Sequence, residues 1–351
     1  MRNSEVLYVD LLLPNEEMRL MQNPELLIAM VREKKYALVI LDEIQKLPKL
    51  LDVVHYLIEN DKIRFALTGS SARKLRRGHA NLLAGRAVIR EMFPLTSLEL
   101  GDKFVLQEAL KYGTLPAIFK LGSFQEKRDF LESYAHSYLR EEIFAEALIR
   151  RIEPFRKFVQ LAAQNAGKLI NMTTLAKAAG VDHKTVKSYY SILEDTLLGF
   201  FLEPYLPSIQ KRLTKSPKFY FFDTGVARAL ADWMTVDPIE STSYFRELFE
   251  QWLVAEIFRV LRYRLSAAKL YFYSVHDCCE VDLVIEYPKQ NPIFVEIKST
   301  TAVKTEHLKN LEKIKDDFPN SKFVLTSRDV HSRNEGNIRC EHWQTFLQNL
   351  T

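Results

Sequence analysis

The feature that most constrains the fold of this chain is a short apolar segment that ends in two carboxylates. Residues 36–43 read Y-A-L-V-I-L-D-E, so five consecutive apolar residues lead directly to Asp42 and Glu43. A strand that is apolar on both faces is typical of the interior of a parallel sheet covered by helices. We therefore expect residues 36–43 to form an inner strand that carries both carboxylates at its carboxyl end.

The neighbouring segments extend this pattern to an α/β layer over residues 1–100. Residues 6–13 and 63–71 have the composition of further apolar strands, and residues 23–34 have that of a helix. Strands that alternate with helices predict a parallel sheet. Ligands bind at the carboxyl ends of the strands in open sheets of this kind. The polar residues at these strand ends are therefore candidates for a binding site.

The polar residues at the strand ends are of the types that bind a nucleoside triphosphate and its magnesium ion. Asp42 and Glu43 end one strand, and Thr68 and Ser70 end the next. In P-loop NTPases a carboxylate at this place holds magnesium, a neighbouring group orients the attacking water, and other polar groups contact the phosphates. A positioned base such as Glu43 typically contributes about 10²–10⁴-fold in rate. The residues alone leave open the alternative that Asp42 and Glu43 only end a buried strand and begin a turn.

The order of these segments resembles a known family, the prokaryotic AAA+ superfamily ATPases with an uncharacterised C-terminal domain. The segments that carry the resemblance are D-E-I-Q-K-L-P (42–48), T-G-S-S (68–71), A-G-R (84–86) and F-P-L-T-S-L-E-L (93–100). The resemblance implies a P-loop NTPase fold that uses ATP and Mg²⁺.

The same resemblance implies roles for individual residues. Asp42 would hold Mg²⁺ in the Walker B segment, and Glu43 would be the catalytic carboxylate. Thr68 and Ser70 fall at the sensor 1 position. Arg86 would reach a phosphate as an arginine finger, with a surface or core-rim arginine as the alternative.

The phosphate-binding loop of such ATPases is missing from the sequence. That loop reads G-x-x-x-x-G-K-[ST], and the only Gly-Lys pair here is Gly167-Lys168, with Ala162 in the first glycine position and Leu169 in the last. In the resembling family the loop lies just before the strand that matches residues 6–13. We therefore expect the chain to begin after it, to bind ATP weakly, and to hydrolyse ATP poorly or not at all.

The middle region has the pattern of a winged helix. Residues 173–180 and 183–195 are predicted helices around a turn at Gly180, and two apolar strands follow at 197–206 and 218–223. This layout is typical of helix-turn-helix proteins that bind DNA. The candidate DNA contacts on the second helix and the basic wing are Lys184, Thr185, Lys187, Lys211, Arg212 and Lys215. The alternative is a module that packs against the ATPase core or mediates assembly.

Carboxylates recur with regular spacing in the C-terminal region. A helix at 245–261 carries Glu250, and a strand at 280–287 is expected to present Glu280, Asp282 and Glu286 on one face. The next strand, at 292–300, places Glu296 and Lys298 two residues apart, so they share a face.

This spacing resembles the core of PD-(D/E)xK nucleases, with Glu250, Asp282, Glu296 and Lys298 as the matching residues. The resemblance implies a divalent metal ion at Asp282 and Glu296, and a lysine that positions hydroxide or stabilises charge. The alternative is an exposed strand face whose Lys–Glu pair contributes only about 0–1 kcal/mol. The same fold also serves binding without cleavage.

Composition narrows the class of protein. The chain has 351 residues and a net charge of +4, which permits DNA binding without arguing for it. No apolar run approaches the roughly 20 residues of a membrane helix, and the N-terminus lacks the shape of a signal peptide. Three cysteines fit a reducing compartment. We expect a cytoplasmic protein with no membrane contact.

The sequence thus predicts an α/β protein in three parts: a partial P-loop NTPase parallel sheet (1–100), a helical and winged-helix region (101–235) and an α/β nuclease-like domain (236–351). The leading hypothesis is an AAA+-type ATPase that lacks its P-loop. The alternative is a metal-dependent DNA-binding or nuclease-like protein with a vestigial ATPase part, and a third is an interaction protein in which neither site works. DNA is the candidate partner, and self-assembly is a further hypothesis.

Overall fold

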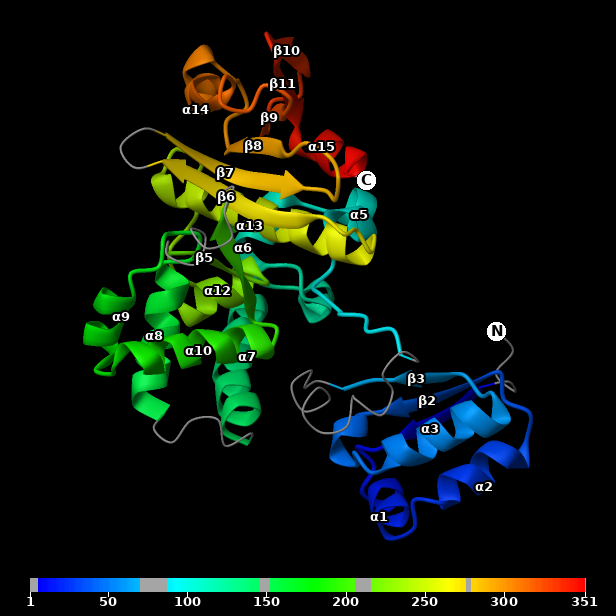
Figure 1. Ribbon diagram of the computed structural model, residues 1–351. Helices are drawn as coiled ribbons and strands as arrows, with labels where there is room; N and C mark the ends of the chain where they lie inside the picture. The colour runs from blue at the N-terminus through cyan, green and yellow to red at the C-terminus, as the bar shows by residue number, and fades with distance from the viewer. Residues whose placement is uncertain (1–5, 70–86, 146–151, 206–215, 276–278, 351) are drawn as a thin grey trace. The chain divides into compact units, whose positions relative to one another are not determined.

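The computed structural model describes residues 6–69, 87–145, 152–205, 216–275 and 279–350, with side chains omitted for 138–145. The chain folds into two compact units, residues 1–90 and 91–351. Figure 1 labels the helices and strands of both units.

The first unit contains a parallel sheet in the order β1–β2–β3. Its strands are β1 (Val6–Asp10), β2 (Leu38–Asp42) and β3 (Phe65–Leu67), and its helices are α1 (Pro14–Gln22), α2 (Leu26–Glu33), the short 3-10 helix η2 (Ile44–Lys46) and α3 (Leu50–Asp61). The parallel sheet confirms the predicted α/β class. Residues 41, 9 and 67 lie opposite one another, so the three strands end at the same edge.

The helices of this unit pack on one face of its sheet (Figure 1). Val39 and Leu41 of β2 are fully buried in one cluster with apolar residues of α1, α2 and α3. Leu38 and Ile40 point to the opposite face and are only half-buried. Burial of both faces, which the apolar run 36–43 predicts, is therefore not seen among the described residues.

The second unit begins with helices that form a bundle around an aromatic core. Its helices are α5 (Ser97–Leu100), η4 (Gly101–Lys103), α6 (Leu106–Tyr112), η5 (Pro116–Lys120), α7 (Phe124–Ala145), α8 (Ile152–Gln164), α9 (Met172–Ala179), α10 (His183–Asp195) and α12 (Thr224–Leu230). Asn171 caps α9 and Asp182 caps α10 through side-chain oxygens. Gly180 closes the turn between them with φ of 67°.

An eight-stranded mixed sheet fills the rest of the second unit, in the order β10–β11–β9–β8–β7–β6–β4–β5. The strands are β4 (Gly199–Pro204), β5 (Lys218–Phe221), β6 (Lys269–Val275), β7 (Cys279–Glu286), β8 (Ile293–Lys298), β9 (Lys322–Ser327), β10 (Arg333–Glu335) and β11 (Ile338–His342). The helices around it are α13 (Ser243–Tyr263), η6 (Thr305–Leu308), α14 (Lys309–Ile314) and α15 (Trp343–Asn349). Apolar residues of α13 and α15 share one core cluster with the sheet, and those of α14 share another.

Strand β4 joins the helical bundle to this sheet. It pairs with β5 from Gly199 to Leu202 in antiparallel register, and with β6 at Glu203–Tyr271 and Pro204–Phe272. The hairpin that follows α10 is therefore the edge of the eight-stranded sheet.

A β-bulge in β7 corrects one sequence expectation. Between the pairs Tyr271–Val284 and Tyr273–Val281, β7 contains one residue more than β6. An extra residue reverses the alternation of side chains along a strand. Glu280 and Glu286 therefore lie on opposite faces, and the prediction that they share one face with Asp282 is wrong.

Buried polar side chains connect the start of the second unit to α12 and α13. Asp223 accepts hydrogen bonds from the backbone N–H of Thr114 (2.7 Å) and of Val226 (3.0 Å). Arg259 donates to the Thr114 hydroxyl (3.1 Å) and pairs with Glu256 at 2.6 Å. Burial raises the pKa of Asp223. Displacing one of these partners would leave a buried polar atom without a hydrogen bond, which lowers the free energy of unfolding.

We expect Gly113→Ala to destabilise the second unit much more than Gly101→Ala. Both glycines have positive φ, 70° and 51°, and an alanine in such a conformation costs roughly 1–3 kcal/mol. At Gly113 the new Cβ would also lie 1.9 Å from Oδ1 of Asp223, whereas nothing lies within 4 Å at Gly101. Displacing the buried carboxylate should add at least about 2 kcal/mol.

Urea unfolding followed by tryptophan fluorescence measures this difference. All three tryptophans, at 233, 252 and 343, lie in the second unit. Equal unfolding midpoints for the two variants would contradict the role assigned to Asp223.

Candidate functional site

The carboxyl edge of the first sheet brings Asp42 and Thr68 together. The Thr68 hydroxyl donates a hydrogen bond to Oδ1 of Asp42, and the Tyr8 hydroxyl donates to Oδ2 at 2.5 Å. The backbone N–H of Glu43 donates to the Thr68 hydroxyl at 3.3 Å. The bond from Thr68, followed by that from Tyr8, lowers the pKa of Asp42. Asp42 is therefore an ionised group at the strand edge at neutral pH.

The residue after Asp42 turns the chain sharply. Glu43 has φ of 58°, which ends β2 and begins η2. The Gln45 side-chain amide donates to the Glu43 carboxylate. Lys46 donates to the Leu11 carbonyl at 3.0 Å and pairs with Glu17 at 2.6 Å. These contacts fasten the D-E-I-Q-K turn to the segment after β1.

Several predicted residues fall outside the described residues, namely Ser70, Arg86, Lys211, Arg212 and Lys215. On α10, Lys184 and Lys187 are exposed, and Thr185 is half-buried. The backbone N–H of Thr185 donates to the Asp182 cap at 2.7 Å. The two lysines are thus available on the surface of the second helix.

In the second unit, β7 and β8 separate at Asp282. The two strands pair from Ile293 to Val295 of β8 and no further. Beyond that point Oδ2 of Asp282 accepts the backbone N–H of Ile297 at 2.7 Å. A carboxylate thus replaces the missing strand partner. This arrangement leaves Asp282 between two strands at the bulge, where bulges often re-aim a side chain.

Glu296 and Lys298 lie beside Asp282 from β8. The Lys298 ammonium is 2.6 Å from Oε1 of Glu296 and 3.9 Å from Oδ2 of Asp282. Asn310 of α14 also donates to Oε1 of Glu296, at 3.0 Å. The predicted shared face of Glu296 and Lys298 is therefore confirmed. The alternative of an exposed strand face is wrong, because the Glu296 side chain is only 1% exposed.

The second oxygen of Glu296 is unusual. Oε2 is buried and makes no hydrogen bond within the described residues. Burial, followed by the charge of Asp282, raises the pKa of Glu296 to about 8, although Lys298 opposes the shift. A buried polar atom without a partner calls for an explanation such as a bound ion.

Two residues of β5 complete the cluster, and sequence reasoning missed both. Lys218 lies 2.6 Å from Glu280 and 3.8 Å from Glu250. The Tyr220 hydroxyl donates to Oε1 of Glu250 at 2.9 Å. Burial, followed by the charge of Asp282, raises the pKa of Glu250 to about 7. A lone lysine in the apolar strand K-F-Y-F is the sequence signal that could have pointed to Lys218.

The donor set limits which metal could bind. No group of three or more His, Cys, Asp or Glu side chains is arranged to hold an ion in the described part of the chain. Mg²⁺ is usually held by one or two carboxylates with water completing its shell. Asp282 and Glu296, with the unpartnered Oε2, fit an ion of that kind.

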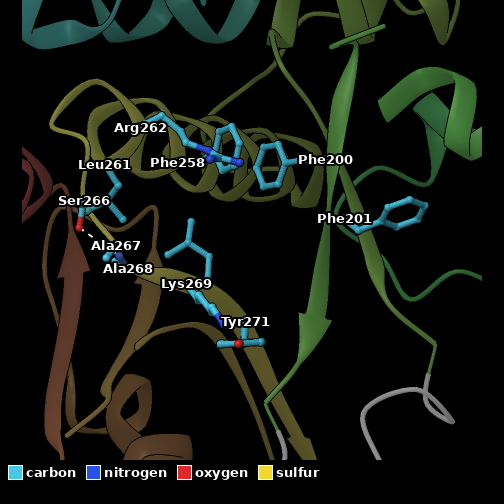
Figure 2. Close-up of a pocket in the computed structure, with 11 residues that line it drawn as sticks. Phe200, Phe201, Phe258, Leu261, Arg262, Ser266, Ala267, Ala268, Lys269 and Tyr271 are labelled. Atoms are coloured by element: carbon cyan, nitrogen blue, oxygen red, sulfur yellow. Dashed lines mark hydrogen bonds between the residues drawn. The ribbon is translucent and has the colours of Figure 1, made fainter. Parts of the chain in front are cut away.

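A separate pocket of about 460 Å³ lies where β4 and β6 diverge beside the end of α13. Figure 2 shows the Arg262 guanidinium over the Phe258 ring, with Phe200 stacked on its other side. Neither the carboxylates nor Lys218 lines this pocket. It is therefore distinct from the acidic cluster.

Comparison with known sequence families divides the chain into three matches. Residues 1–101 match a family described as "AAA domain". Residues 104–237 match "Domain of unknown function (DUF8612)", and residues 245–343 match "Domain of unknown function (DUF4143)". The chain therefore has an AAA domain at its N-terminus, which indicates an ATPase-like nucleotide-binding family, and a C-terminal domain of a family without a described function.

The curated relatives are uncharacterized proteins. One from Mycobacterium tuberculosis is 26% identical over 266 residues, which cover 75% of this chain and 59% of the relative. One from Haemophilus influenzae is 23% identical over 314 residues, covering 85% and 73%. The chain spans about 59% of the length of the mycobacterial relatives. No solved structure matches it.

No helix in the described part of the chain is both long enough and apolar enough to cross a membrane.

Proposed function

We propose that residues 1–90 contain the residues that bind Mg²⁺ in an ATP site. The observation that supports this most directly is the contact between Asp42 and Thr68 at the shared edge of β2 and β3. An ionised carboxylate at the end of a strand is the group that holds magnesium in P-loop NTPases. Asp42 would hold the ion, Thr68 and Ser70 would contact phosphate, and Arg86 would stabilise developing charge.

Glu43 is the proposed group that orients the attacking water. Its carboxylate is engaged by Gln45, so this contact must loosen before Glu43 can reach a water. The sequence has no G-x-x-x-x-G-K-[ST] segment, and that segment supplies most of the backbone N–H groups that cradle phosphate. We therefore propose that residues 1–351 bind ATP weakly on their own.

We expect residues 1–351 to bind Mg²⁺–ATP with a Kd of about 1 mM or weaker, equivalent to roughly 4 kcal/mol. Asp42→Asn should abolish this binding, because it removes the charge that faces the ion. Asp52→Asn is the matched control, since Asp52 is exposed on α3. Ligand-observed NMR suits affinities in this range.

Two results would count against this proposal. Equal binding by wild type and Asp42→Asn would remove Asp42 from the site. Steady-state turnover of about 1 s⁻¹ or faster, which is ordinary for an enzyme, would contradict the expected weakness of the chain alone.

We further propose that α9, α10 and the β4–β5 hairpin form a winged helix that contacts DNA. The exposure of Lys184 and Lys187 on the second helix supports this. Lys211, Arg212 and Lys215 would form the basic wing, and Thr185 would lie at the start of the contact helix.

The proposed DNA contact predicts a change in salt dependence. Each phosphate contact by a lysine contributes about 0.9 to the slope of log K against log salt. Replacing Lys184 and Lys187 with alanine should therefore reduce the slope for duplex DNA by about 1.8. The matched control replaces Arg156 and Lys157, two exposed residues of α8. Equal slopes for both double variants would place the contact elsewhere.

A second candidate function, metal-dependent phosphodiester cleavage, is favoured by one observation. Asp282, Glu296 and Lys298 converge where β7 and β8 separate, and Oε2 of Glu296 has no partner in the part of the chain that the structure describes. Asp282 and Glu296 would hold a divalent ion, which supplies activation of a water when bound. Lys298 would stabilise charge on the phosphate, and Glu250 would support the cluster from α13.

We expect plasmid DNA incubated with the chain and Mg²⁺ or Mn²⁺ to be nicked, and Asp282→Asn to reduce the rate at least about a hundredfold, because a metal ligand contributes several kcal/mol. Asparagine retains an acceptor for the Ile297 N–H, so the fold should persist. Asp316→Asn, in an exposed position after α14, is the control. If wild type and Asp282→Asn leave the plasmid equally intact, a binding or interaction role becomes the better hypothesis.

A further inference from the structure

The acidic cluster contains a buried lysine that none of the proposed roles uses. We propose that Lys218 is a fixed cation that takes the place of a second metal ion, so that the cluster binds a single divalent cation. This inference rests on the proposed metal-dependent function of the same site. Lys218 would be a positioning residue, because it acts through Glu250 and Glu280.

Burial fixes the position of the Lys218 charge. Its side chain is 4% exposed, and its ammonium lies 5.3 Å from the centre of the Phe272 ring. The Lys218 backbone pairs with Leu202 in the β4–β5 ladder. A lysine buried to this degree destabilises the fold unless its charge is paired. The contacts with Glu280 (2.6 Å) and Glu250 (3.8 Å) supply that pairing.

The formal charges of the cluster leave room for one divalent ion. The carboxylates are Glu250, Glu280, Asp282 and Glu296, and the ammonium groups are Lys218 and Lys298. Burial favours the protonated forms of Glu250 and Glu296 while no cation is bound. When a cation ionises them, four negative and two positive charges leave a surplus that one divalent cation neutralises. Oε2 of Glu296, on a side chain that is 99% buried, has no partner among the described residues, and this is an independent observation that favours a cation here.

The location of Lys218 also means that the site spans two family matches. Lys218 and Tyr220 lie within residues 104–237, whereas all four carboxylates lie within residues 245–343. Lys218 and Tyr220 are two residues apart in β5, so they point to the same face. The hairpin that follows α10 therefore completes the charge balance of the acidic cluster.

The inference predicts that two substitutions change the Mn²⁺ affinity of the complete chain in opposite directions. Electron paramagnetic resonance and calorimetry measure this affinity and the number of bound ions. We expect wild type to bind one ion. Lys218→Met removes a positive charge, so it should tighten binding by about tenfold or admit a second ion. Glu280→Gln removes a negative charge and should weaken binding by about tenfold. A purely structural role would make both variants bind less.

Further variants guard against unfolding and nonspecific charge effects. Lys269→Met is the matched control, because Lys269 is an exposed lysine of β6 in the same sheet. It should leave affinity and ion number unchanged. Lys218→Arg should restore wild-type behaviour. Thermal unfolding of each variant shows whether it is folded.

The outcomes separate this inference from the function on which it rests. If Asp282→Asn abolishes Mn²⁺ binding but Lys218→Met behaves as wild type or binds less, the role of Lys218 is refuted and the metal site stands. If Lys218→Met binds Mn²⁺ but wild type does not, the inference is refuted, because the wild-type cluster then holds no divalent ion. If neither wild type nor Lys218→Met binds Mn²⁺, both the inference and the metal-dependent function fail.

Discussion

The separation of β7 from β8 is the constraint on which the acidic cluster depends. Two adjacent strands normally satisfy each other's backbone groups, and a gap between them leaves a buried N–H without a partner. Here the Asp282 carboxylate accepts the Ile297 N–H, so the gap persists without that cost. The bulge in β7 aims Asp282 into this gap. Glu296 and Lys298 can then approach it from β8.

The first unit uses strand ends in a different way. Its three parallel strands finish at one edge, and polar side chains of neighbouring strands contact each other there. The hydrogen bonds to Asp42 come from Thr68 on one side and Tyr8 on the other. The site of the first unit is thus an edge of a regular sheet, whereas the cluster of the second unit is a defect inside one. Both place carboxylates where a cation would be favourable.

Local features were predictable wherever the signal lies within a few residues. The caps at Asn171 and Asp182 and the turn at Gly180 depend on single residues and their immediate neighbours. The carboxyl end of β2 at Asp42 and the pairing of Glu296 with Lys298 follow from strand periodicity. Strand and helix lengths were less accurate, because tertiary contacts decide where an element stops.

The sequence by itself determined the α/β character of the first unit, the carboxylates at its strand end and the spacing of the acidic residues near the C-terminus. Only the tertiary structure decided that Glu280 and Glu286 face opposite ways and that Lys218 reaches Glu280 and Glu250. The reason is physical. A bulge is a property of the register between two strands, and a buried ion pair between distant residues depends on which strands become neighbours. Neither is encoded in the periodicity of a single segment.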